Sequence, residues 1–224
     1  MKLGKPIPVS FAAGLFFCLL LSFPGTGCSP QNLKKQGQPD KTWSCRKEAD
    51  EAMKRQDYET SILLHERLLE EDPRNGLALY HLGYAHGQTG DHEKEAFYYE
   101  KALAAGFDQD GIFFNLGMAC GELNRLEEAG KAFRRGTEAD PHSADNWFGL
   151  ALTLQKNGDY KGSEKAFSEA IRIDPGHLEA RLFLSMLYAD TGEREKAIHQ
   201  LEGILSLDPH YAQAREFLED LKAR

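Results

Sequence analysis

A unit of 34 residues recurs along this chain, and its period limits the folds that the chain can adopt. The clearest copy is ADNWFGLALTLQKNGDYKGSEKAFSEAIRIDP, from Ala144 to Pro175. Four of the five units end at a proline, namely Pro73, Pro141, Pro175 and Pro209. In the remaining unit, Phe107 occupies the position of the proline. A period of roughly 20–50 residues is typical of solenoids, in which each unit packs against its neighbours. We therefore expect five copies of one small structural unit.

Each copy has a turn signal near its middle. Glycine or asparagine occupies four of the five equivalent positions, which are Gln56, Gly90, Asn124, Gly158 and Gly192. A residue just past a helix end commonly adopts the left-handed conformation, which glycine and asparagine tolerate best. A small residue precedes the turn in every copy, at Ala49, Gly83, Gly117, Ala151 and Ser185. Small side chains let two helices approach closely, so each copy is predicted to be a helical hairpin.

The second half of each unit repeats as well. A row of small residues contains Ser61, Ala129, Ser163 and Ala197, and is interrupted only by Glu95, which lies beside Ala96. A row of mostly larger side chains contains His65, Tyr99, Phe133, Phe167 and Leu201. Several rows in register argue against a generic helical bundle with coincidental spacing.

These residues resemble the tetratricopeptide repeat (TPR) family. The fourth copy matches the family pattern at Trp147, Leu150, Ala151, Gly158, Tyr160, Phe167, Ala170 and Pro175. The first copy fits least well, with Glu48 where leucine is usual and His65 where an aromatic residue is usual. The resemblance implies an all-α fold, a right-handed α-solenoid of five hairpins plus a C-terminal capping helix. The expected repeats are 42–75, 76–109, 110–143, 144–177 and 178–211, and the capping helix is 212–224.

The N-terminal segment 1–27 reads as a secretory signal. Lys2 and Lys5 precede an apolar run from Phe11 to Phe23. This run is shorter than the roughly 20 apolar residues that a membrane-spanning helix requires. Residues 28–41 are polar and contain proline and glycine, so we expect a flexible tether that reaches on the order of 20 Å.

Gly25-Thr26-Gly27-Cys28 resembles the lipobox of bacterial lipoproteins, which implies lipid attachment at Cys28. Gly25 departs from the aliphatic residue usual in that motif, and this leaves a soluble secreted protein or an uncleaved anchor as alternatives. The serine that follows the cysteine, Ser29, resembles the pattern of lipoproteins that are sent to the outer membrane. The expected location is therefore the bacterial cell envelope, at the outer membrane and facing the periplasm.

Charge and motifs argue against several classes of function. The net charge is −8, and no cluster of lysine and arginine indicates nucleic-acid binding. The sequence has no GxSxG, P-loop or paired-carboxylate motif, so we predict no catalytic residues, no cofactor and no enzyme activity.

Cysteine and histidine spacing predicts neither a disulfide nor a metal site. Cys45 and Cys120 lie two repeats apart, roughly 20 Å at helix-packing distances, whereas a disulfide requires Cα atoms within about 7 Å. Both are expected to be small packing residues, buried or half-buried. His81, His86 and His92 lack a metalloprotease spacing. The histidines are therefore expected at ordinary loop and surface positions.

The TPR resemblance implies that the first helix of each repeat lines a groove. Carried over by phase, its inner-face pairs in repeats two to five are Tyr80, Tyr84, Phe114, Met118, Phe148, Leu152, Leu182 and Met186. The members of each pair are four residues apart, on one helical face. One interpretation is an apolar groove that accepts an extended or helical peptide from another envelope protein. The alternative is that these side chains pack sideways between adjacent helices and expose little.

Together these features predict a non-catalytic, lipid-anchored scaffold of the bacterial envelope. By architecture it is similar to small TPR lipoproteins that help to assemble type IV pili or their secretins. Two alternatives stay open. One is an adaptor for cell-wall enzymes or outer-membrane assembly factors, and the other is a regulatory subunit of a separate catalytic chain.

Overall fold

The structure is a computed structural model that describes residues 44–109 and 111–223. These residues all belong to one compact unit of the chain. The predicted signal peptide, lipid attachment at Cys28 and tether 28–41 lie outside the described residues. None of the described helices is both long and apolar enough to cross a membrane.

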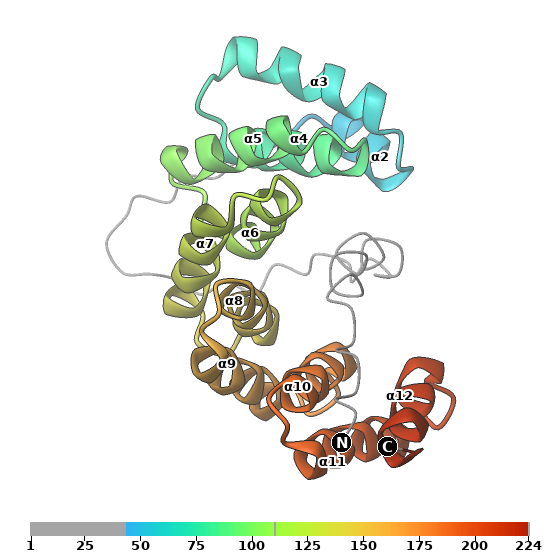
Figure 1. Cartoon of the computed structure of the whole chain (residues 1–224). Helices are drawn as coiled ribbons and strands as arrows, with labels where there is room; N and C mark the ends of the chain where they lie inside the picture. Colours follow the sequence, from blue (N-terminus) through green and yellow to red (C-terminus); the bar gives the residue numbers. More distant parts are fainter. Residues whose placement is uncertain (1–43, 110, 224) are drawn as a thin grey trace. The chain divides into compact units, whose positions relative to one another are not determined.

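The described residues form eleven helices and no strand, which confirms the all-α prediction (Figure 1). In chain order the helices are α2 Lys47–Lys54, α3 Tyr58–Glu71, α4 Gly76–Gln88, α5 His92–Ala105, α6 Ile112–Glu122, α7 Leu126–Ala139, α8 Ala144–Lys156, α9 Tyr160–Ile173, α10 Leu178–Asp190, α11 Arg194–Leu207 and α12 Ala212–Ala223. Each helix packs against the next one along the chain. In addition, α6 contacts α4 and α8, the first helices of the neighbouring hairpins. This sequential packing of hairpins is that of an α-solenoid.

The turn inside each hairpin has the predicted left-handed residue. Backbone φ is +60° at Gln56, +81° at Gly90, +57° at Asn124, +80° at Gly158 and +82° at Gly192. A positive φ costs a non-glycine residue about 1–2 kcal/mol, so three of the five turns use the residue that avoids this cost.

Aspartate begins three of the five second helices. The carboxylate of Asp57 accepts a hydrogen bond from the backbone N–H of Thr60. Asp159 caps α9 in the same way through the N–H of Gly162, and Asp91 caps α5. Such caps stabilise a helix by about 1 kcal/mol because they satisfy otherwise unpaired N–H groups.

Glycine takes over the role of the missing proline at the end of α5. Gly106 has φ +95°, and the N–H of the next residue, Phe107, donates to the carbonyl of Ala102 at 2.9 Å. This left-handed ending stops the helix without proline. It also buries Phe107, whose ring stacks on Tyr80 at 5.2 Å between centroids.

The core includes the two rows predicted from the second helices, together with apolar residues of the first helices. The larger row is almost fully inaccessible: His65, Tyr99, Phe133, Phe167 and Leu201 are each at most 1% exposed. The small residues of the first helices leave room for these rings. A Cβ atom at Gly83 would lie 2.7 Å from the Tyr99 ring, and one at Gly117 would lie 2.5 Å from the Phe133 ring. Glycine is therefore required for this helix spacing.

The prediction for the cysteines is confirmed, and the prediction for the histidines is partly wrong. Cys120 is buried and Cys45 is half-buried, as predicted for packing residues, and both are free thiols. The prediction that the histidines occupy loop and surface positions is wrong for His86, which is 5% exposed, whereas His65, 0% exposed, belongs to the buried row described above. They lie inside helices, where the repeat places a core side chain.

Candidate functional site

The predicted groove residues of the second and third repeats keep part of their surface accessible. Tyr80, Phe114 and Met118 are half-buried, and Tyr84 is 37% exposed. Tyr80, Phe114 and Met118 pack on the same core cluster, and α4 contacts α6. We call these four residues the α4–α6 surface.

Aromatic contacts hold the α4–α6 surface in place. Asn115 Nδ2 donates to the Tyr80 hydroxyl at 3.3 Å and so links α6 to α4. The Tyr84 ring meets the edge of Tyr58 from α3, with centroids 6.2 Å apart. Phe114 lies 5.9 Å from the core ring of Phe133. Because their bases are fixed by the core, these side chains present an apolar surface at little cost in conformational entropy.

The predicted groove residues of the fourth and fifth repeats are mostly covered. Phe148, Leu152 and Leu182 are 4%, 6% and 3% exposed, and Met186 is half-buried. The Phe148 ring contacts His177 at 4.9 Å and Phe183 at 5.7 Å. Phe148 therefore packs against α10 and the residue that caps it, and the accessible part of the predicted set is concentrated on α4 and α6.

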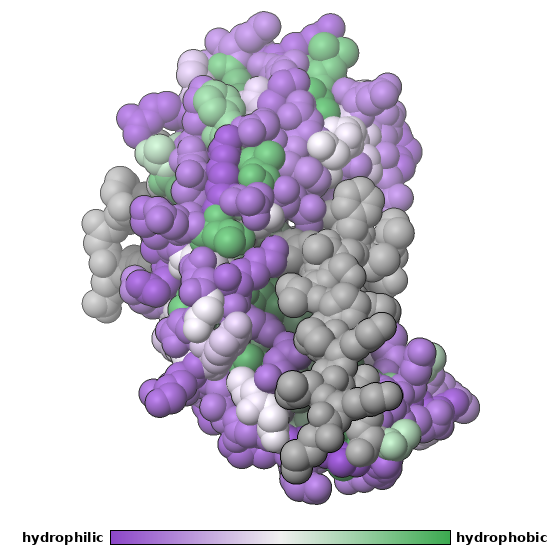
Figure 2. Space-filling model, viewed as in Figure 1, coloured by the Kyte–Doolittle hydropathy of each residue, from purple (hydrophilic) through white to green (hydrophobic). Residues whose placement is uncertain are grey.

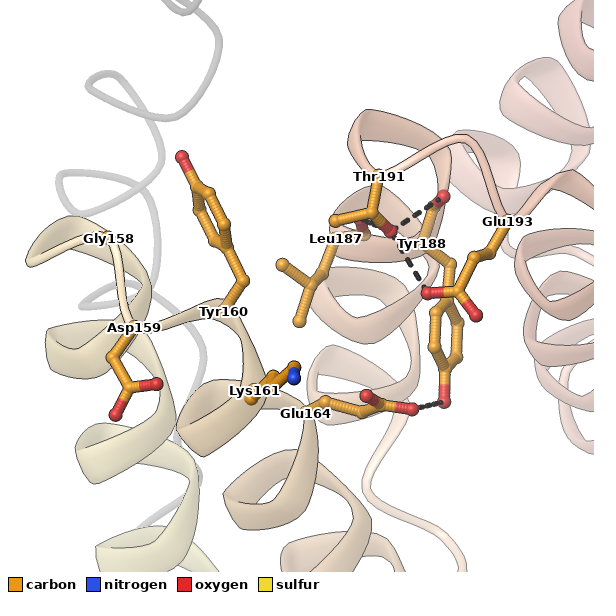
Figure 3. Close-up of a pocket in the computed structure, with 9 residues that line it drawn as sticks. All are labelled: Gly158, Asp159, Tyr160, Lys161, Glu164, Leu187, Tyr188, Thr191 and Glu193. Carbon is orange, nitrogen blue, oxygen red and sulfur yellow. Dashed lines mark hydrogen bonds between the residues drawn. The ribbon is translucent and has the colours of Figure 1, made fainter.

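The face of the molecule in Figure 2 is largely hydrophilic, with its apolar residues in separate groups. A surface hollow of about 470 Å³ lies between the start of α9 and the end of α10, and Figure 3 shows the residues that line it. Within it, the Tyr188 hydroxyl donates to Glu164 at 2.9 Å, and the Tyr160 ring projects away from that pair. Burial and this hydrogen bond raise the pKa of Tyr188. No sequence pattern indicated the hollow. The Glu164 carboxylate already has two partners, the Tyr188 hydroxyl and the Lys196 ammonium, which lies 3.6 Å away.

A second group of chemically active side chains lies in the first repeat and the start of the second, where the sequence predicted no metal or catalytic site. It consists of Cys45 before α2, Asp50 in α2, His65 in α3 and His81 in α4. One potential ligand atom from each residue lies within 4.8 Å of those of the other three. Sequence reasoning missed this group because its members are separated along the chain and belong to no local motif. The mismatch of His65 with the family pattern was the one available signal.

Comparison with known families identifies the repeat. A family model described as tetratricopeptide repeat matches residues 46–110 and 114–178, and another with the same description matches residues 154–221. No curated protein matches the chain.

Several solved structures share the fold. YrrB, described as a TPR protein with an unusual peptide-binding site, has 23% identity and a TM-score of 0.68; the match covers 76% of this chain and 88% of YrrB. MamA has 21% identity and a TM-score of 0.69, covering 74% and 96%. TTC0263, a thermophilic TPR protein of Thermus thermophilus, has 20% identity and a TM-score of 0.60, covering 79% and 96%. At these identities the similarity establishes the fold.

Proposed function

Because the chain belongs to the tetratricopeptide repeat family, we propose that it is a non-catalytic scaffold that binds a peptide segment of another protein on the α4–α6 surface. The observation that carries this proposal is the accessible aromatic group on two contacting helices. Tyr84, the most exposed of the eight predicted groove residues, lies at its edge, and Tyr80, Phe114 and Met118 complete it.

The chemistry of this surface favours an apolar anchor. Its side chains offer aromatic rings and a thioether, and aromatic residues are enriched among the positions that dominate binding energy at interfaces. Tyr80, Tyr84 and Phe114 supply neither the ammonium nor the amide groups by which some TPR proteins bind a C-terminal carboxylate. A peptide with large apolar side chains, extended or helical, suits the surface better than a charged chain terminus. The peptide-binding site named for YrrB supports this class of function.

The finer proposal places this scaffold in the bacterial envelope. Its support is the N-terminal sequence, in which a signal-like segment precedes the lipobox-like Gly25-Thr26-Gly27-Cys28. Acyl chains on Cys28 would anchor the tether to a membrane, and the repeats would recruit another envelope protein, in pilus or secretin assembly or as an adaptor for cell-wall enzymes. A Cys28→Ala variant should then leave the membrane fraction; an unchanged membrane fraction would contradict the anchor.

Site-specific photocrosslinking in cells tests the peptide-binding proposal. A photoreactive amino acid replaces Tyr84, and a matched control replaces Tyr160, which is 52% exposed and lies in the fourth repeat. We expect one protein to be captured from the position of Tyr84 and not from that of Tyr160. The captured peptide should contain large apolar side chains. The same products from both positions would refute a specific site on the α4–α6 surface.

A further inference from the structure

The group Cys45, Asp50, His65 and His81 has the composition of a transition-metal site. Thiolate, imidazole and carboxylate are the ligands that Zn²⁺ uses in proteins. The four residues come from three helices and the segment before them. They lie close together because of the fold, although they are spread over residues 45–81 of the chain.

Three distances in this cluster, all from His81, are close to those of tetrahedral coordination. His81 Nδ1 lies 3.0 Å from His65 Nε2, 3.5 Å from Cys45 Sγ and 3.8 Å from Asp50 Oδ1. Zinc bonds of about 2.0–2.3 Å at tetrahedral angles place ligand atoms about 3.3–3.8 Å apart. All four ligand atoms lie within 4.8 Å of one another, so side-chain adjustments of about 1 Å or less would bring them to these distances around one ion.

The hydrogen bonds around His65 orient it as a ligand. Its Nδ1 lies 2.8 Å from the backbone carbonyl of Ser61 in the preceding turn of α3. A carbonyl oxygen only accepts, so Nδ1 carries the proton and Nε2 presents its lone pair to the cluster. Histidines that bind metals typically donate their second ring nitrogen to a carbonyl or carboxylate in this way.

Within the described part of the chain, one oxygen of the Asp50 carboxylate lacks a hydrogen-bond partner, although the side chain as a whole is 40% exposed. Its Oδ1 atom is buried and has no hydrogen-bond partner among the described residues. A buried carboxylate oxygen without a partner is costly. A dication among the four ligand atoms would remove this cost, and with one thiolate, one carboxylate and two neutral imidazoles the site would have no net charge.

The elements that carry the ligands are fixed without an ion. Asn75 Nδ2 donates to the carbonyl of Ser44 at 3.0 Å, which holds the segment that contains Cys45. Arg46 forms an ion pair with Glu71 at the end of α3.

We propose that Cys45, Asp50, His65 and His81 bind one Zn²⁺ ion in a closed, four-coordinate structural site. On binding, the Cys45 thiol releases its proton to solvent and the thiolate bonds to zinc. The ion joins the segment before α2 to α3 of its own hairpin and to α4 of the next. This link would add to the contacts of α2, which has only eight residues.

Metal titration of the full chain tests this proposal. Chelator-treated protein in detergent is titrated with Co²⁺ as a spectroscopic probe and with Zn²⁺ against a chromogenic chelator. We expect one equivalent of either ion to bind, with the intense visible bands of tetrahedral cobalt and a thiolate-to-cobalt charge-transfer band. Zinc should raise the Tm and increase hydrogen-exchange protection of α2, α3 and α4 without affecting α10 and α11.

Ligand variants separate this site from adventitious binding. Cys45→Ser should abolish the charge-transfer band and weaken zinc binding at least about 100-fold, and His81→Gln should weaken it similarly. Cys120→Ser, which changes a buried thiol in the third repeat, should bind as the unchanged protein does. Circular dichroism checks that each variant is folded. Failure to bind one equivalent of zinc, or undiminished binding by folded Cys45→Ser and His81→Gln, would overturn the proposal. The His65–His81 contact would then be a hydrogen bond within the core.

Discussion

At the scale of single residues, the residue at each hairpin turn is constrained by the backbone conformation it must adopt and not by contacts of its side chain. Gly158 has φ +80°, and nothing lies within 4 Å of the place where its Cβ atom would be. A side chain there would meet no clash, so the effect of a substitution reports the backbone alone. The equivalent residue of the first repeat, Gln56, adopts φ +60° at an energetic cost.

Replacing these two residues in opposite directions should give opposite effects on stability. Gly158→Ala should lower the free energy of unfolding by about 1–2 kcal/mol because alanine is strained at positive φ. Gln56→Gly should be neutral or stabilising by up to about 1 kcal/mol, since glycine relieves that strain but gains entropy when unfolded. Urea unfolding followed by circular dichroism measures both. Equal losses for the two variants would show that the turns do not depend on left-handed geometry.

His86 makes stability depend on pH. Its ring stacks on Tyr98 with 4° between the planes, and its Nε2 is buried with no hydrogen-bond partner among the described residues. Burial lowers the pKa of His86, and the charge of Lys94 lowers it further, despite opposing contributions from Asp91 and Glu66. The unfolded chain, with a histidine pKa of about 6.5, therefore binds the proton more readily than the folded protein.

Stability should accordingly fall as the pH drops below about 6.5 toward the folded-state pKa of His86. His86→Phe retains the ring that stacks on Tyr98 and removes the titrating group. Unfolding curves at about pH 7 and about pH 5 should show a smaller loss of stability for this variant than for the unchanged protein. If both proteins lose the same amount, protonation of His86 does not contribute.

At the scale of helices, the spacing within a hairpin depends on the absence of a side chain. Gly117 in α6 faces the Phe133 ring of α7, which is 1% exposed and cannot move away. Gly203 in α11 is a matched control, because its Cβ atom would meet the terminal guanidinium of Arg181 at 3.2 Å, and that flexible side chain can shift.

Gly117→Ala should destabilise the protein by about 1–3 kcal/mol through overpacking, although alanine favours the helix. Gly203→Ala should be neutral or stabilise by up to about 1 kcal/mol through helix propensity. The two free energies of unfolding, measured side by side, test the packing explanation. A stabilising effect at Gly117 would mean that α6 and α7 can move apart without loss.

The helices were predictable from the sequence because every repeat places side chains of similar size at equivalent positions. The row from His65 to Leu201 and the turns at Gly90 and Gly192 occupy equivalent positions, so each copy supports the others. The end of α5 was less predictable. Phe107 interrupts the proline pattern, and the left-handed Gly106 that replaces proline follows no repeat.

At the scale of the whole molecule, contacts between repeats decide which predicted site residues remain accessible. Phe148 and Tyr80 have equivalent positions in the repeat, but Phe148 is covered by Phe183 in α10 and by His177, which caps α10. No pattern within one repeat contains that information. The same holds for the cluster around His81, whose ligands come from two hairpins.

Peptide binding on the α4–α6 surface can be tested by a comparison of affinities. The full chain is titrated with the peptide captured from the position of Tyr84, as the unchanged protein, as Tyr84→Ala and as Tyr160→Ala. Tyr84→Ala should weaken binding at least about tenfold, corresponding to about 1.4 kcal/mol, and Tyr160→Ala should leave the Kd unchanged. An unchanged Kd for Tyr84→Ala, or equal losses for the two variants, would contradict binding at this surface.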